Sequence, residues 1–206
     1  MNDLDRACPN TVSKVELRRD LLKKRLSLSK GEWRLKSDRI ISHLQASPLF
    51  AKSRTILAYF SFRQEPDLSP LFSDFHHRWG FPRCANNALS WHIWMPTESH
   101  LWQRGAYGIL EPDLTVPTLE PDEVDLILVP AVACDHRGYR LGYGGGYYDR
   151  LLSSDMWASK PTIGIVFESA YLQHLPIDSW DKPLQGVCTE TGLLTFESNS
   201  ACNFEI

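Results

Sequence analysis

EVDLILVPAVACDHRGYRLGYGGGYYDRLL, residues 123–152, decides the fold, because it joins an apolar run to a glycine-rich loop and then to a helix pattern. The first part, EVDLILVPAVAC at 123–134, is the strongest strand pattern in the chain, and its continuity predicts burial on both faces of a parallel sheet. Ligands in such sheets bind beyond the carboxyl ends of the strands, where a loop leads into a helix. The loop at 142–146 therefore lies where we expect a site.

Strand and helix patterns alternate outward from this stretch. Leucines at helical spacing predict a helix from Lys14, and a capping box at 29–32 predicts a second helix that ends before Pro48. Ser69, followed by a proline, indicates the start of another helix. Strands are predicted at 55–61, 88–96, 161–167, 186–190 and 193–196.

This alternation predicts an α/β fold, a three-layer α/β/α sandwich around a mainly parallel sheet. A length of 206 residues suits a single domain. We expect residues 10–196 to form its core and residues 197–206 to form a loose tail.

The composition excludes several classes of function. A net charge of −3 gives no global field that would attract nucleic acid. The longest apolar stretch, 126–134, is too short to span a membrane, and the N-terminus lacks the layout of a secretory signal, so a cytoplasmic location is expected. Five cysteines without a CxxC spacing indicate neither disulfides nor zinc, and we interpret Cys134 and Cys188 as small core residues.

The glycine loop and its flanks supply candidate site residues. Backbone N–H groups of the four glycines at 142–146 could bind phosphate oxygens, but the loop matches neither the Walker pattern nor GxGxxG. Taken alone, it leaves phosphate binding and a tight turn packed by aromatic residues equally open. Asp149 is either a helix-dipole partner or a magnesium ligand. Lys14 and Arg18, four positions apart, share a helix face that composition alone would assign to solvent.

Five motifs occur in the order known from one enzyme family. They are KVELR at 14–18, YFSFRQEPD at 59–67, GAYGILEP at 105–112, the glycine–tyrosine stretch at 129–152 and SWDKPLQGVCTE at 179–190. The chain thus resembles the 5-formyltetrahydrofolate cyclo-ligases over nearly its whole length. The resemblance implies the fold type of ribose-phosphate isomerases and CoA transferases. It also implies conversion of 5-formyltetrahydrofolate and ATP, with Mg²⁺, into 5,10-methenyltetrahydrofolate, ADP and phosphate, with small-molecule substrates as the partners of a monomer.

The resemblance also assigns roles to residues, each at the position that matches a family motif. It implies three catalytic residues, Arg140, Tyr147 and Asp149, and two magnesium ligands, Asp149 and Asp181. The implied ATP-binding residues are Lys14, Arg18, Arg140, Leu141, Gly142, Tyr143, Gly144, Gly145, Gly146, Tyr147 and Tyr148. The implied folate-binding residues are Phe60, Glu65, Tyr107, Tyr143, Gly144, Gly145, Gly146 and Tyr147.

Two other interpretations remain open at this stage. A sugar-phosphate isomerase or CoA transferase relative would share the architecture, but no base or nucleophile motif of that kind is evident. A folate- or nucleotide-binding protein without turnover would not need the full set of Lys14, Arg18, Asp149 and Asp181. In addition, some relatives carry basic side chains in the glycine loop where this chain has Tyr143 and Gly145.

Overall fold

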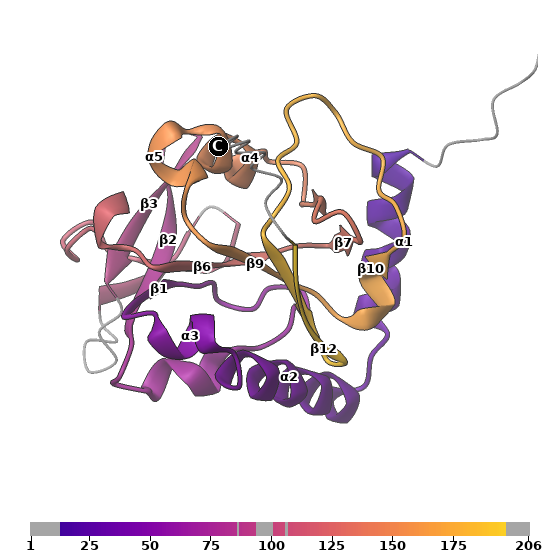
Figure 1. The fold of residues 1–206 in the computed structure, drawn as a ribbon, viewed down its shortest axis with the longest axis horizontal. Coiled ribbons are helices and arrows are strands. Elements are labelled where there is room, and N and C mark those ends of the chain that lie inside the picture. The colour runs from indigo at the N-terminus through magenta and orange to yellow at the C-terminus, as the bar shows by residue number, and fades with distance from the viewer. Residues whose placement is uncertain (1–12, 86, 94–100, 106, 197–206) are drawn as a thin grey trace, which may run out of the picture.

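A mostly parallel sheet forms the centre of the protein in the computed structural model, which describes residues 13–85, 87–93, 101–105 and 107–196. In this part of the chain the sheet has seven strands in the order β12-β11-β9-β6-β1-β2-β3 (Figure 1). Neighbours from β11 to β2 pair in parallel, whereas β12 and β3 are antiparallel edges. The strands are β1 Thr55–Leu57, β2 Arg78–Ala85, β3 Ala88–Ile93, β6 Leu126–Pro130, β9 Thr162–Ile165, β11 Gly186–Thr189 and β12 Gly192–Thr195.

Helices cover both faces of this sheet. On one face lie α2 (Lys30–Gln45), α3 (Pro48–Lys52) and the 3₁₀ turn η1 (Ser69–Ser73), and on the other lie α4 (Tyr147–Ser153) and α5 (Asp155–Ala158). The helix α1 (Lys14–Leu26) lies at one end of the sheet, beside β7 (Ala133–Asp135) and β10 (Tyr171–Leu172) (Figure 1). The mixed α/β fold with a largely parallel central sheet is confirmed.

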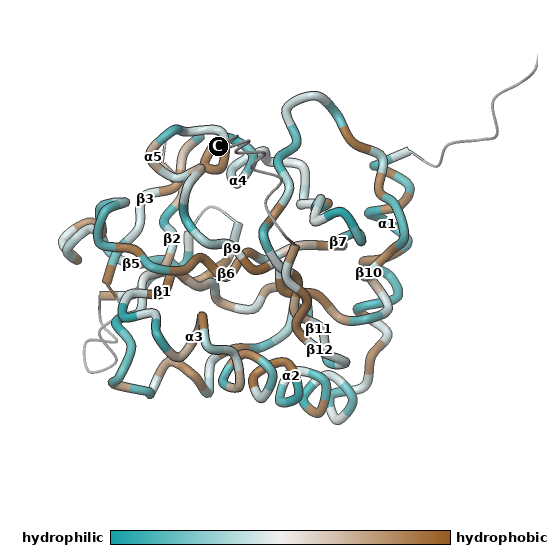
Figure 2. Tube along the Cα trace, viewed as in Figure 1, coloured by the Kyte–Doolittle hydropathy of each residue, from teal (hydrophilic) through white to brown (hydrophobic). Residues whose placement is uncertain are grey.

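Strand β6 shows why the apolar run at its position is continuous. Leu126 and Leu128 are buried in the core cluster beneath α2 and α3, and Ile127 and Val129 are buried in the cluster beneath α4 and α5. Successive side chains of a strand point to opposite faces, so a strand covered on both faces has no position for a polar residue. Figure 2 shows the same hydrophobic band along β6 and β9.

The prediction of a single strand at 123–134 is wrong, because this segment forms two strands in different sheets. The chain leaves the main sheet after Pro130, which has no N–H to continue a ladder, and the Val132 N–H donates to the Leu141 carbonyl at 2.7 Å. It then forms β7 (Ala133–Asp135) in a separate sheet with β8 (Arg140–Leu141) and β10 (Tyr171–Leu172). This small sheet carries the glycine loop.

Local signals placed most of the other elements. Ser13 and Ser29 each form a capping box, with Glu16 and Glu32, at the first two helices. The helix expected from Ser69 is only the 3₁₀ turn η1, and the strand expected at 55–61 ends at Leu57. The remaining elements are β4 (Trp102–Arg104), β5 (Leu110–Pro112), η3 (Pro121–Glu123) and η4 (Glu168–Ala170).

Several expectations concern residues outside the described ranges. These are the tail at 197–206, the first residues of the predicted core at 10–12, and the end of the predicted strand at 88–96. Within the described ranges, Cys134 and Cys188 are buried core residues as predicted, and burial raises the pKa of each thiol to about 12. No helix in this part of the chain is long and apolar enough to cross a membrane.

Candidate active site

The basic face of α1 points toward the glycine loop. Lys14 Nζ lies 2.6 Å from Asp178 Oδ2 and 2.5 Å from Asp181 Oδ2, and Arg18 Nε donates to the Gly142 carbonyl at 2.7 Å. Partial burial lowers the pKa of Lys14, but the hydrogen bonds to the two carboxylates outweigh it and raise that pKa. Composition alone suggested that Lys14 and Arg18 are solvated charges, but in the structure both make hydrogen bonds to other segments of the protein.

The glycine loop depends on backbone conformations that favour glycine. Gly144 has φ of +100°, and Gly146, the N-cap of α4, has φ of +67°. A Cβ atom at Gly146 would lie 2.7 Å from Arg150 Nη1, and Arg150 Nη2 donates to the Gly145 carbonyl at 2.9 Å. The left-handed φ values explain why Gly144 and Gly146 are glycine, since the flexible Arg150 guanidinium could move away from a Cβ atom.

Three predicted nucleotide residues place their side chains inward. Arg140, with a side chain 4% exposed, donates from Nη2 to Asp149 Oδ1 at 2.6 Å and lies over the Tyr148 ring at 5.4 Å. Leu141 is in the core, and the Tyr148 ring packs beside Trp91. Leu141 and Tyr148 thus offer the site mainly their backbone, and Arg140 anchors the loop to α4.

The two predicted magnesium ligands have separate partners in this structure. Asp149 pairs with Arg140, and Asp181 pairs with Lys14 and accepts a hydrogen bond from the Asp178 N–H at 2.7 Å. The described residues contain no group of three or more His, Cys, Asp or Glu side chains placed to hold a metal. Mg²⁺ is usually held by one or two carboxylates together with phosphate oxygens and waters, and the Asp149 carboxylate, 27% exposed, suits that role by its chemistry.

Glu65 lies on a strained turn that follows β1. Arg63 and Gln64 adopt left-handed conformations with φ of 49° and 56°, which non-glycine residues rarely adopt. The Glu65 carbonyl accepts hydrogen bonds from Trp33 Nε1 and Ser61 Oγ, each at 2.8 Å. Such strain persists only where surrounding contacts fix it, and it is concentrated at functional sites.

The Glu65 carboxylate is buried and only half satisfied. It is 3% exposed, its Oε2 accepts from the Phe62 N–H at 3.0 Å, and its Oε1 has no partner in the described part of the protein. Burial raises its pKa to about 7, although Arg25, the Phe62 N–H and the Tyr143 hydroxyl each lower it. Gln64 Oε1 is a second buried acceptor, and it too has no hydrogen-bond partner among the described residues. Two consecutive residues of this turn thus each present a buried acceptor oxygen that could receive a hydrogen bond.

Arg25 is a site residue that the sequence analysis missed. It is 7% exposed and donates to the carbonyls of Arg63 at 3.0 Å and Ala131 at 3.3 Å, and to the Tyr143 hydroxyl. The missed signal is its spacing, because seven residues after Arg18 is two helical turns on the same face. The helix α1 therefore directs three basic residues, Lys14, Arg18 and Arg25, toward the candidate site, and not only the first two.

Aromatic residues predicted to bind folate occupy two neighbouring segments. The Tyr107 and Tyr147 hydroxyls lie 3.3 Å apart and their rings meet edge to face, so the segment around Tyr107 contacts the start of α4. This hydrogen bond is the main cause that raises the pKa of Tyr147 to about 12. Phe60 stacks on Phe81 with ring centroids 4.2 Å apart, at the carboxyl end of β1.

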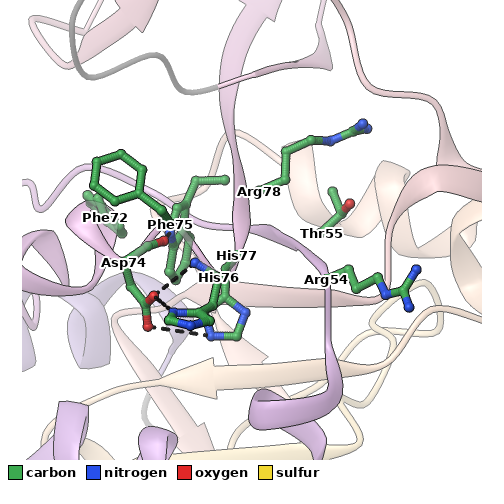
Figure 3. Close-up of a pocket in the computed structure, with 9 residues that line it drawn as sticks. Arg54, Thr55, Phe72, Asp74, Phe75, His76, His77 and Arg78 are labelled. Carbon is green, nitrogen blue, oxygen red and sulfur yellow. Dashed lines mark hydrogen bonds and ion pairs between the residues drawn. The ribbon is translucent and has the colours of Figure 1, made fainter.

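A different hollow, of about 580 Å³, lies at the opposite edge of the sheet (Figure 3). His76 and His77 lie against Asp74, while the guanidinium groups of Arg54 and Arg78 extend away from the imidazoles. Two of its charged groups pair with neighbouring side chains: Asp74 Oδ1 lies 2.8 Å from His76 Nδ1, and Arg78 pairs with Glu123 at 2.5 Å. None of the predicted site residues lines this hollow. The candidate site residues described above lie instead on the side of the sheet where the parallel strands have their carboxyl ends, which we call the carboxyl edge.

The carboxyl edge defines a class of protein. It combines a glycine loop, a basic helix face and a buried carboxylate with a free acceptor oxygen, in the place where parallel α/β sheets bind ligands. This is an α/β protein whose candidate site lies at the carboxyl ends of its parallel strands.

Comparison with known proteins gives the family. A model of the 5-formyltetrahydrofolate cyclo-ligase family matches residues 10–190. A 5-formyltetrahydrofolate cyclo-ligase of Mycolicibacterium smegmatis is 30% identical over 186 residues, which cover 86% of this chain and 93% of that protein. A Haemophilus influenzae protein of the same description is 40% identical over 85 residues, which cover 40% of this chain and only 44% of that relative.

A solved structure agrees with these relatives. The 5,10-methenyltetrahydrofolate synthetase of Aquifex aeolicus superposes with a TM-score of 0.77 at 34% identity, covering 92% of this chain and 98% of that one. The chain belongs to the 5-formyltetrahydrofolate cyclo-ligase family, and the resemblance drawn from its motifs is confirmed.

Proposed function

We propose that the protein catalyses the ATP- and Mg²⁺-dependent conversion of 5-formyltetrahydrofolate into 5,10-methenyltetrahydrofolate, with release of ADP and phosphate. Family membership supports the overall reaction. The observation that carries the proposal is the position of Glu65, whose free acceptor oxygen lies on a turn bonded through Arg25 to the glycine loop. The carboxyl edge of the sheet would thereby bind both a folate and a nucleotide.

The phosphate half of the proposed site uses groups that have substitute partners in the free protein. Lys14 is held by Asp178 and Asp181, and Arg18 is held by the Gly142 carbonyl. A triphosphate carries more negative charge than these partners, so it would draw both cations to itself. The N–H groups of the glycine loop would add hydrogen bonds to the transferring phosphoryl group.

The folate half uses acceptors and aromatic surface. A pterin presents ring N–H and amino donors along one edge, which match the unpartnered Oε1 atoms of Glu65 and Gln64. Donors at this carboxylate would favour its charged form and lower its pKa from about 7. Tyr107, Tyr143 and Tyr147 are aromatic residues near this edge that would pack against the flat ring system and its benzoyl group.

The chemistry follows from the weak reactivity of a formyl group on nitrogen, which is amide-like. In the proposed sequence the formyl oxygen attacks the γ-phosphorus and ADP leaves, which gives an iminium phosphate. N10 then attacks the formyl carbon and loses its proton, and phosphate departs with the former formyl oxygen. Each ATP thus provides a phosphate leaving group for an oxygen that would otherwise leave as hydroxide.

Two carboxylates would hold Mg²⁺ in this proposal, Asp149 and Asp181. The ion would supply positive charge that neutralises the phosphate oxygens during transfer. Arg140, paired with Asp149 at 2.6 Å, would fix the orientation of that carboxylate. Lys14 would have to exchange Asp181 for phosphate when the nucleotide binds.

Turnover tests the proposal. Purified protein is mixed with 5-formyltetrahydrofolate and MgATP, and the near-ultraviolet absorbance of the methenyl product is followed together with ADP release. The expected result is one ADP for each methenyl product, and no product when ATP is omitted. Tight binding of both ligands with no absorbance change would reject catalysis in favour of a binding protein.

A further inference from the structure

Arg25 joins three segments that are distant in sequence. Its guanidinium donates to Arg63 in the turn after β1, to Ala131 after β6, and to the Tyr143 hydroxyl in the glycine loop. It also lies over the Tyr143 ring at 5.6 Å. A planar guanidinium with donors in a fixed fork can satisfy several acceptors at once, which a lysine cannot. Arg25 is therefore a junction between the folate and nucleotide halves of the edge.

The bond to the Arg63 carbonyl acts on the most strained backbone of the site. Arg63 and Gln64 are consecutive left-handed residues, and Glu65 follows them directly. The Glu65 N–H closes this turn on the Phe62 carbonyl at 3.0 Å. Two such conformations are unfavourable for residues with a Cβ, so the turn needs contacts that hold it. Arg25 supplies one of them from a separate helix.

Arg25 also supplies the positive charge that faces Glu65. The titratable groups that act on this carboxyl are Arg25 from α1, Tyr143 from the glycine loop, Tyr59 after β1 and Tyr148 from α4. Burial raises the pKa of all three tyrosines, so they stay neutral through the physiological range. Among the groups that lower the pKa of Glu65 and so favour its charged form, Arg25 has the largest effect, ahead of the Phe62 N–H and the Tyr143 hydroxyl.

We propose that Arg25 is the positioning residue for the folate half of the site, where it holds the turn that presents Glu65, places a positive charge near that carboxyl and fixes it relative to the glycine loop. The role of Glu65 toward folate rests on the proposed function. The contacts of Arg25 do not, and they can be tested in the free protein.

The first test is a carboxyl titration by NMR on the free protein labelled with ¹³C at the glutamate side chains. The Glu65 signal is assigned by its loss in Glu65→Gln. We expect a midpoint near pH 7 in the wild type, and a midpoint higher by about one pH unit or more in Arg25→Met, because a facing cation moves a carboxyl pKa by about 1–3 units. The matched control is Lys23→Met, which removes an exposed charge from the same turn of α1.

A second variant separates charge from position and guards against misfolding. Arg25→Lys keeps the cation but cannot make all three bonds, so the Glu65 midpoint should remain near that of the wild type. The Michaelis constant of Arg25→Lys for 5-formyltetrahydrofolate should nevertheless rise about tenfold, and its Michaelis constant for ATP should change less. Its melting temperature should stay close to that of the wild type.

The outcomes separate this inference from the proposed function. An unchanged Glu65 midpoint in Arg25→Met would overturn the electrostatic role. Equal losses for both substrates with a lowered melting temperature in Arg25→Lys would overturn the positioning role. If the wild type makes no methenyl product, the proposed function fails, while the titration still decides whether Arg25 controls Glu65.

Discussion

Replacing Glu65 with glutamine should stabilise the free protein while weakening its binding of folate. The carboxyl is almost fully buried, and burial raises its pKa from 4.5 to about 7. A group whose pKa is higher in the folded state adds stability below its unfolded pKa, and this contribution is lost as pH rises through the folded pKa. Glutamine is neutral throughout, so the variant avoids that loss.

The size of the effect follows from the same two values. The pKa of Glu65 rises by about 2.5 units on folding, and each unit corresponds to 1.36 kcal/mol. Above pH 7 the free energy of unfolding of Glu65→Gln should therefore exceed that of the wild type by about 3 kcal/mol. For a chain of 206 residues this is a melting temperature higher by roughly 6–12 °C. Near pH 4.5 and below, the two proteins should melt together. Folate affinity should fall by about 1.5–3 kcal/mol, because the charge-assisted acceptor is lost.

Calorimetry measures both sides of this prediction. Melting scans of the wild type and Glu65→Gln at pH 4.5 and pH 8 give the stability difference, and isothermal titration with 5-formyltetrahydrofolate and with ATP separately gives the affinities. A variant that melts at or below the wild type at pH 8 would refute the buried-charge argument. Equal weakening of both ligands would refute Glu65 as a folate contact.

Three further changes test the nucleotide half. Asp149→Asn keeps an acceptor for its arginine partner but should lower kcat about a hundredfold or more and change its Mg²⁺ dependence, whereas full activity at limiting Mg²⁺ would exclude a metal ligand. Lys14→Gln with Arg18→Gln should raise the Michaelis constant for ATP about tenfold at low ionic strength, with stability changed by about 1 kcal/mol, and an unchanged ATP dependence would contradict this. Gly144→Ala should cost about 1–3 kcal/mol in stability or ATP binding, because the φ of Gly144 is +100°. The control Gly31→Ala places its Cβ in open space and should be neutral. Equal effects of the two variants in calorimetry would count against strain in the loop.

Elements with local causes were predictable from the sequence. The capping box of Ser29 and Glu32 fixed the start of α2, and the unbroken apolar run of β6 indicated burial on two faces. The break after Pro130 was not predicted, because the residues beyond it are as apolar as those before it. Their pairing with β8 and β10 depends on contacts that the run itself does not encode.

The site was predictable only where motifs carried it. The glycine loop was chosen from its own pattern and its position after a buried strand, whereas Glu65 and Lys14 were assigned roles only through the resemblance. Arg25 was missed because its partners lie 38, 106 and 118 positions away, and a basic run in a helix usually faces solvent. The inward orientation of that face follows from the tertiary fold, not from α1 alone.

The central claim is that ATP activates the formyl oxygen at this site, and an isotope experiment tests it most directly. Substrate labelled with ¹⁸O in the formyl group is converted with MgATP in unlabelled water, and the released phosphate is analysed by mass spectrometry. The account predicts one ¹⁸O atom in each phosphate, because the formyl oxygen becomes the bridging oxygen and leaves with phosphorus. Methenyl product formed together with unlabelled phosphate would contradict it.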